Sequence, residues 1–152
     1  ALRVAGYLDL GVGGIFDLSG RIEVSGDLRI HLNGTSRFTI SSSGALIVGS
    51  APSGDGGDIE LYTRGPMDIQ GTVSAGNTAL FPGRGGSIVL RAYRDIVISG
   101  TGGSLRVGGG PGGDGVMEIY TEGELRVVDA PAAPTSACER RLRWDGMLRS
   151  NG

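Results

Sequence analysis

The chain has few of the residues that build catalytic or metal centres. Its 152 residues include one cysteine and one histidine, and all fourteen of its basic residues are arginine. A single cysteine, Cys138, excludes a disulfide within the chain and leaves a free thiol or an intermolecular disulfide. Paired cysteines for zinc, a phosphate-binding loop and a nucleophile constellation are also absent. We therefore expect no cofactor, no metal ligands and no catalytic residues.

The charge and hydropathy of the chain argue against a nucleic-acid partner and against a membrane-spanning helix. The formal net charge is −2, so no basic field points to nucleic acid. No apolar run reaches the roughly 18 residues that a membrane-spanning helix requires. The 30 glycines interrupt most helical windows, and no apolar period of 3.6 persists for ten residues. We expect neither a nucleic-acid partner nor a membrane span, and little helix.

Regular columns of apolar residues run through the chain instead. Ile59, Ile88 and Met117 follow one another at intervals of 29 residues. The same interval relates three further columns, which are Leu61, Leu90, Ile119; Met67, Ile96, Leu125; and Ile69, Ile98, Val127. Recurrence in register is typical of stacked repeats. A sandwich or an antiparallel barrel is the competing β architecture, but hairpins have no reason to keep one interval across three copies.

Each repeat contains short strands with apolar residues at alternate positions, the period of a half-buried strand. A first side is predicted at Leu8/Leu10, Ile30/Leu32, Ile59/Leu61, Ile88/Leu90 and Met117/Ile119. A second side follows eight positions later in all five copies, at Phe16/Leu18, Phe38/Ile40, Met67/Ile69, Ile96/Ile98 and Leu125/Val127. A third side is predicted at Ile22/Val24, Leu46/Val48, Val73/Ala75 and Leu105/Val107.

Three short strands per turn predict an all-β fold, a parallel β-helix (β-solenoid) of about five coils over residues 1–130. Leu2 and Val4 would form the last side of a preceding, incomplete coil. Glycine-rich segments at 49–58, 76–87 and 108–116 would place the long loops on one edge. A proline-linked, non-repeat arm follows at 131–152, which either caps its own chain or docks onto a neighbouring subunit.

Two groups of residues have the composition of a catalytic or a metal site, and each group also has a purely structural interpretation. His31 is predicted to lie between Asp9 and Glu60, where it could act as a base, although a cross-strand polar ladder is favoured. The loop 54–58 and its counterpart 112–115 have the glycine and aspartate content of calcium sites. The equivalent loop of the middle copy carries Arg84, so structural turns are favoured there.

The coil ends are the strongest candidates for contacts, because a stack leaves unpaired backbone groups on its first and last rungs. The candidate subunit contacts are Leu2, Val4, Leu125 and Val127 on the rungs and Leu142, Trp144, Met147 and Leu148 on the arm. A second candidate is a lateral apolar patch formed by Val89 and Val97, which occupy outward positions that are mostly polar in other coils.

The turns Gly56-Gly57-Asp58-Ile59-Glu60-Leu61 and Gly85-Gly86-Ser87-Ile88-Val89-Leu90, with the stretch 69–76, resemble bacterial surface β-helix proteins. The nearest in style are filamentous-haemagglutinin-type adhesins and autotransporter passenger domains. This resemblance covers residues 2 to about 130 and implies a right-handed helix, export to the cell surface, and adhesive or structural work.

Together these features predict a non-enzymatic, extracellular structural protein that assembles with copies of itself by stacking of coil ends, with the arm bridging subunits. The chain starts at Ala1 without an initiator methionine or a signal peptide, as a mature secreted protein or an excised fragment would. The main alternative is an adhesive module that binds surface glycans through its glycine-rich loop edge. A polysaccharide-active enzyme is the third reading.

Overall fold

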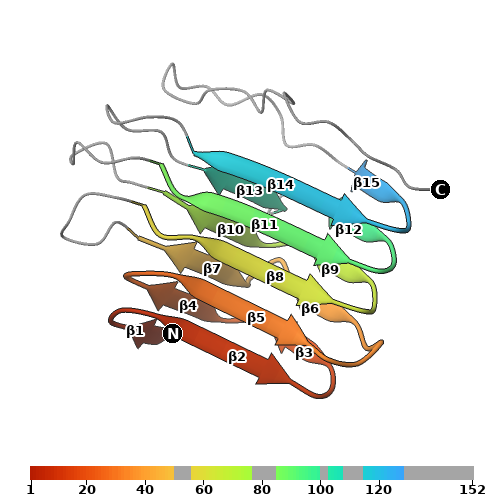
Figure 1. Cartoon of the computed structure of the whole chain (residues 1–152), viewed down its shortest axis with the longest axis horizontal. Helices are drawn as coiled ribbons and strands as arrows, with labels where there is room; N and C mark the ends of the chain where they lie inside the picture. Colours follow the sequence, from red (N-terminus) through yellow and green to blue (C-terminus); the bar gives the residue numbers. More distant parts are fainter. Residues whose placement is uncertain (50–55, 77–84, 100–102, 108–114, 129–152) are drawn as a thin grey trace.

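The computed structural model describes residues 1–49, 56–76, 85–99, 103–107 and 115–128. In these residues the secondary structure consists of short strands and turns, without helices. The strands form three five-stranded sheets, and every pairing is parallel. The predicted parallel β-helix is therefore confirmed, and Figure 1 shows its coils ascending as a right-handed stack.

We call the three sheets A, B and C. Sheet A contains β1 (Leu2–Val4), β4 (Arg21–Val24), β7 (Ala45–Val48), β10 (Thr72–Ala75) and β13 (Ser104–Val107). Sheet B contains β2 (Leu8–Val12), β5 (Leu28–Leu32), β8 (Ile59–Thr63), β11 (Ser87–Ala92) and β14 (Val116–Thr121). Sheet C contains β3 (Phe16–Leu18), β6 (Phe38–Ile40), β9 (Met67–Ile69), β12 (Ile96–Ser99) and β15 (Leu125–Val128).

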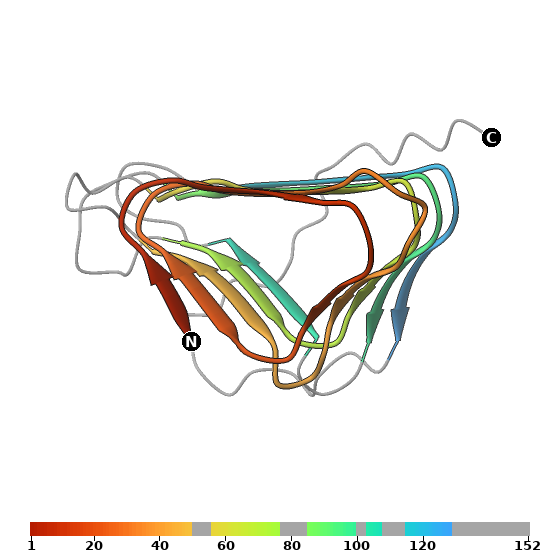
Figure 2. The same ribbon diagram turned by 90° about the horizontal axis from the view of Figure 1, so that it is seen from below.

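The core fills the space between the three sheets, which enclose it in the view along the stack (Figure 2). Alternate strand residues point inward because successive side chains of a strand project to opposite faces. The inward residues form ladders of like side chains, such as the stacked rings of Phe16 and Phe38, whose centroids lie 4.7 Å apart. Apart from the partly buried Val107, inward side chains of the second to fourth coils are almost completely buried.

The 29-residue interval is confirmed in sheets B and C. Ile59, Ile88 and Met117 lie in one ladder of sheet B, and Met67, Ile96 and Leu125 lie in one ladder of sheet C. The third side also has the predicted pairs, and Leu2 and Val4 pair with Ile22 and Val24 as the end of a preceding coil. The predicted arm at 131–152 lies outside the described residues.

The predicted register of the second coil is wrong by two residues. Ile30 pairs with Leu10 and Leu61, and Leu28 rather than Ile30 pairs with Leu8 and Ile59. The spacing of eight between the first and second sides therefore fails in this coil, where the turn between Leu32 and Phe38 is two residues longer. A shift of two keeps every side chain on its own face, so alternation alone does not reveal it.

Candidate functional site

The ladders end in apolar residues that are only partly covered. In the described chain β2 pairs with β5 alone and β14 with β11 alone, so each sheet has two edge strands. Leu2 is 49% exposed and Val127 is 54% exposed, while Val4 and Leu125 are half-buried against the core. Leu142, Trp144, Met147 and Leu148 of the predicted arm lie outside the described residues.

Val89 and Val97 both point outward and are half-buried, but they belong to different sheets. Val89 lies in β11 between Glu60 and Glu118, and Val97 lies in β12 between Asp68 and Arg126. They therefore do not share a ladder. Val89 instead lines a small hollow of about 170 Å³ on the outer face of sheet B.

The predicted ladder of Asp9, His31 and Glu60 is wrong, because the second coil is shifted. Arg29 takes the place between Asp9 and Glu60, and its Nε donates to Glu60 Oε2 at 2.9 Å. His31 lies two residues further along the strand, paired with Gly11 and Tyr62. Its ring packs against Tyr62 with centroids 5.6 Å apart. The histidine thus belongs to an aromatic column rather than to a pair of acids.

The outer face of sheet B concentrates the chain's tyrosines. The chain has four tyrosines and one histidine, and all five lie on or beside this face. One outward column runs Asp9, Arg29, Glu60, Val89, Glu118, and the next runs Gly11, His31, Tyr62, Arg91, Tyr120. The apolar pattern of the sequence does not predict the second column, because it marks a single apolar pair per strand, whereas β5, β8, β11 and β14 are five or six residues long.

The same face divides into two halves of different chemistry. The half at the strand starts is acidic, with one arginine, Arg29, among the carboxylates Asp9, Asp27, Asp58, Glu60 and Glu118. The half at the strand ends we call the tyrosine-arginine strip, which consists of His31, Tyr62, Arg64, Arg91, Tyr93, Arg94 and Tyr120. Glu122 is the carboxylate beside this strip.

Rings and guanidinium groups of the strip contact one another across the coils. Tyr62 meets Tyr93 edge to face with centroids 6.1 Å apart, and the guanidinium of Arg91 lies 5.0 Å from the ring centre of Tyr120. Hydrogen bonding to Tyr62 raises the pKa of the Tyr93 hydroxyl and also that of Arg64. The Tyr120 hydroxyl donates to Glu118 at 2.8 Å, and this bond raises the pKa of Tyr120. These contacts hold the exposed rings in place.

A hollow of about 440 Å³ opens at the end of the strip, where sheet B turns into sheet C. It is lined by Thr35, Arg64, Tyr93, Arg94 and Glu122, which come from four successive coils. Ligand sites typically have volumes of about 300 to 1,000 Å³. This hollow is therefore large enough for part of a ligand that crosses several coils.

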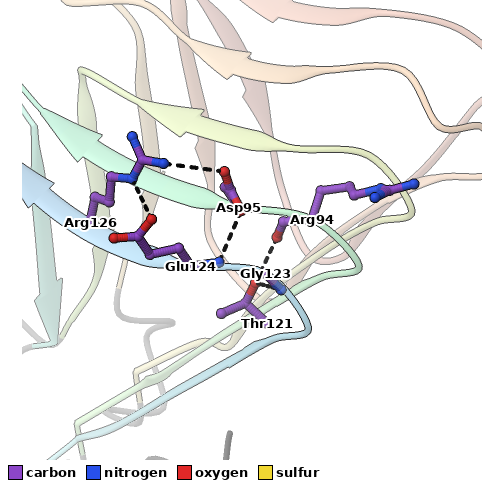
Figure 3. A network of polar contacts seen from close by, with 6 residues as sticks. All are labelled: Arg94, Asp95, Thr121, Gly123, Glu124 and Arg126. Atoms are coloured by element: carbon purple, nitrogen blue, oxygen red, sulfur yellow. Dashed lines mark hydrogen bonds and ion pairs between the residues drawn. The ribbon is translucent and has the colours of Figure 1, made fainter. Parts of the chain in front are cut away.

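A network of polar contacts fixes the turn that carries Arg94 (Figure 3). The Thr121 hydroxyl donates to the Arg94 carbonyl oxygen at 2.6 Å and accepts from the Gly123 amide at 3.1 Å. The Asp95 carboxylate accepts from the Glu124 amide at 2.9 Å. The Arg94 side chain points away from this network in Figure 3, so its backbone is anchored while its guanidinium projects outward.

Two carboxylates of the acidic half, Asp27 and Asp58, bind backbone amides at the starts of strands. Asp27 Oδ1 accepts from the Asp58 amide at 3.0 Å, and Asp58 Oδ1 accepts from the Ser87 amide at 2.9 Å and from the Ser87 hydroxyl at 2.7 Å. Asp58, at the end of one of the two loops with the composition of a calcium site, therefore supports the next coil. The rest of these loops falls largely outside the described residues, and the described chain contains no group of three or more potential metal ligands.

The glycine-rich loop edge predicted to bind glycans lies mostly in residues 50–55, 77–84 and 108–114, outside the described part. Within the described residues no helix is long and apolar enough to span a membrane. Comparison with known proteins identifies no relative, since no family model, no curated protein and no solved structure matches the chain.

Proposed function

We propose that this chain is an extracellular structural protein whose coils stack end to end with those of further copies to form a filament. The observation that carries the proposal is the equal strand number of the three sheets. Each has five described strands, so each strand of the upper rung has a counterpart in the lower rung. A second copy could therefore continue all three sheets at once.

The inward residues that would meet in such a stack are apolar on both rungs. If the register continues, Leu8 and Leu10 of the next copy cover Met117 and Ile119. On sheet C, Phe16 and Leu18 would cover Leu125 and Val127, and on sheet A, Leu2 and Val4 would cover Leu105 and Val107. Covering these partly exposed side chains removes apolar surface from water, at roughly 25 cal/mol per Å². The three edge strands on each rung also supply backbone hydrogen-bonding groups.

A contact between the two unlike ends does not close on itself, so its repetition gives a filament rather than a ring. Five rungs at about 4.8 Å give an axial repeat of about 24 Å per copy. The strands would lie perpendicular to the filament axis, as they do within one copy (Figure 1).

Electron microscopy of the purified chain over a range of concentrations tests the proposal. We expect unbranched filaments whose number rises with concentration and whose layer spacing is about 4.8 Å. Sedimentation velocity gives the matching measurement in solution. A chain that remains monomeric by both methods at every concentration would rule out end-to-end stacking.

A further inference from the structure

We propose that the tyrosine-arginine strip on sheet B binds an acidic polysaccharide, with sugar rings lying on the tyrosines and carboxylates held by the arginines. This inference is independent of filament formation, because the strip covers the side of the coils rather than their ends. It also assigns glycan binding to the outer face of sheet B rather than to the glycine-rich loop edge.

The tyrosines have the exposure and the fixed orientation that a sugar platform requires. Tyr93 is 49% exposed and Tyr120 is 48% exposed, yet each ring contacts a neighbour in the strip. Tyrosine combines an apolar ring with a polar hydroxyl, which suits the alternating C–H and hydroxyl surfaces of a sugar. Because these contacts already restrict the rings, a ligand that lies on them loses less side-chain entropy.

The arginines specify an acidic ligand. Arg3, Arg21, Arg29 and Arg126 each pair with a carboxylate of the protein. Among the described residues, Arg64, Arg91 and Arg94 have no carboxylate within ion-pair distance. A guanidinium group binds a carboxylate through two parallel hydrogen bonds, so these three can accept the acidic groups of a ligand.

The arrangement of the strip favours a long ligand over a small anion. Tyr62, Arg91 and Tyr120 follow one another on successive coils, and adjacent strands lie about 4.8 Å apart. The hollow at the strand ends also spans several coils. A chain running parallel to the stack axis would meet a ring or a guanidinium on each rung from the second coil to the fifth.

The neighbouring acidic half restricts how an acidic chain can lie on this face. Its carboxylates lie on the same face, where they repel the acidic groups of a ligand. A uronic acid polymer can turn neutral hydroxyl groups toward this half and its carboxylates toward Arg64 and Arg94. The charge pattern thus favours a sugar chain whose acidic groups lie along one side.

Isothermal titration calorimetry of the full chain with alginate oligosaccharides tests the assignment at low salt. Two further ligands separate the contribution of the carboxyl groups from that of the sugar rings. They are the same oligosaccharides with their carboxyl groups reduced to alcohols, and polyglutamate of matched length. We expect alginate to bind and both further ligands to bind at least about fivefold more weakly. Equal binding of polyglutamate, tighter binding of an oligouridylate, or no binding of alginate would overturn the proposal.

Five variants test where the ligand binds on the molecule. Tyr93→Ala and Arg94→Gln should each weaken alginate binding by about 2- to 10-fold, and the double variant should weaken it further. Matched controls are Tyr7→Ala in the acidic half and Arg3→Gln on sheet A, which should bind as the unmodified chain does. Circular dichroism should show the same fold in all five. Loss of binding in the controls, or unchanged binding in the double variant, would contradict the proposed site.

Discussion

Gly57 lies against the carbonyl oxygen of Gly26 in the coil below, so closely that a Cβ on Gly57 would be 2.2 Å from that oxygen. The same Cβ would be 2.4 Å from the Val48 side chain. Gly86 repeats the relationship on the next coil, with 2.2 Å to the Gly57 carbonyl oxygen. At this corner between sheets A and B the coils stack backbone on backbone, which only glycine permits.

We therefore expect Gly57→Ala to destabilise the protein by about 1 to 3 kcal/mol, because the backbone must move to admit a methyl group. Gly11→Ala is the matched control, since a Cβ there would have no neighbour within 4 Å. Its effect should lie within about 0.5 kcal/mol of zero. Chemical denaturation of the three proteins gives the comparison. Equal stability of Gly57→Ala and Gly11→Ala would contradict the close stacking at this corner.

Thr63 provides a second prediction, because it is a polar residue in the core ladder and is 0% exposed. Its hydroxyl accepts from the Gly65 amide at 2.9 Å and donates to the Ser36 carbonyl oxygen at 3.4 Å. Thr63→Val removes both bonds while keeping the shape, and it leaves the amide without a partner. We expect a loss of about 1 to 3 kcal/mol in the free energy of unfolding.

Thr121 is the natural control for that substitution. It makes the same two kinds of bond, to the Gly123 amide and the Arg94 carbonyl oxygen, but in an exposed turn. Water can replace the lost partner there, so Thr121→Val should have the smaller effect. Denaturation curves that rank the two variants in the opposite order would refute this reasoning.

Glu23 on sheet A links stability to pH. It lies between Arg3, at 2.7 Å, and Arg21. Partial desolvation raises the pKa of Glu23, but hydrogen bonds and charges of Arg21 and Arg3 outweigh it and hold the pKa below its ordinary 4.5. Its contribution to stability is therefore complete above the unfolded-state pKa and is lost as pH falls through the lower folded-state value.

Thermal unfolding of the unmodified chain and of Glu23→Gln, measured between neutral and acidic pH, checks this sign. The unmodified chain should melt at the higher temperature near neutrality, and the difference should shrink on acidification below about 4.5. A difference that stays constant over the whole range would show that the ion pairs are not the cause.

The repeats were predictable from sequence wherever consecutive coils have the same total length. Ile59, Ile88 and Met117 keep one interval because the connection between the second and third sides is longer in the fourth coil than in the third, and the connection back to the first side is shorter by the same amount. The second coil was misaligned because Leu28, Ile30 and Leu32 alternate in the same way as Leu8 and Leu10, so a shift of two residues leaves the pattern intact. The length of the turn between the strands, rather than the alternation of apolar residues, sets the register of the second coil.

The tyrosine-arginine strip was missed although a signal for it was present. Tyr62 and Tyr120 are two 29-residue intervals apart, so the periodicity that aligned the core also aligns them. Outward residues carry no apolar signal, however, and their grouping depends on the register of every coil. The sequence pattern places His31 beside Asp9 and Glu60, whereas the strand pairing places it beside Tyr62 in this column.

The predicted arm can be tested by ending the chain after Ala130. The described sheets end at Val128, so the shortened protein should keep its β signal in circular dichroism. If the arm bridges subunits, filaments should become fewer or disappear in electron micrographs, and Trp144→Ala in the full chain should reproduce part of that loss. Filaments unaltered by both changes would remove the arm from the assembly.

End-to-end stacking predicts opposite effects on assembly for two substitutions that change the net charge equally. With the register continued, Arg126 of one copy faces Asp17 of the next, which attracts, and Glu118 faces Asp9, which repels. Asp17→Arg would place two arginines together and should raise the concentration needed for assembly, by up to about fivefold. Glu118→Arg would face Asp9 with an arginine and should lower that concentration.

Because both variants replace one acid with one arginine, net charge alone would change the two assembly concentrations in the same direction. That outcome in sedimentation assays would argue against this register. The difference between the variants should also diminish at high salt, since screening weakens exposed pairs.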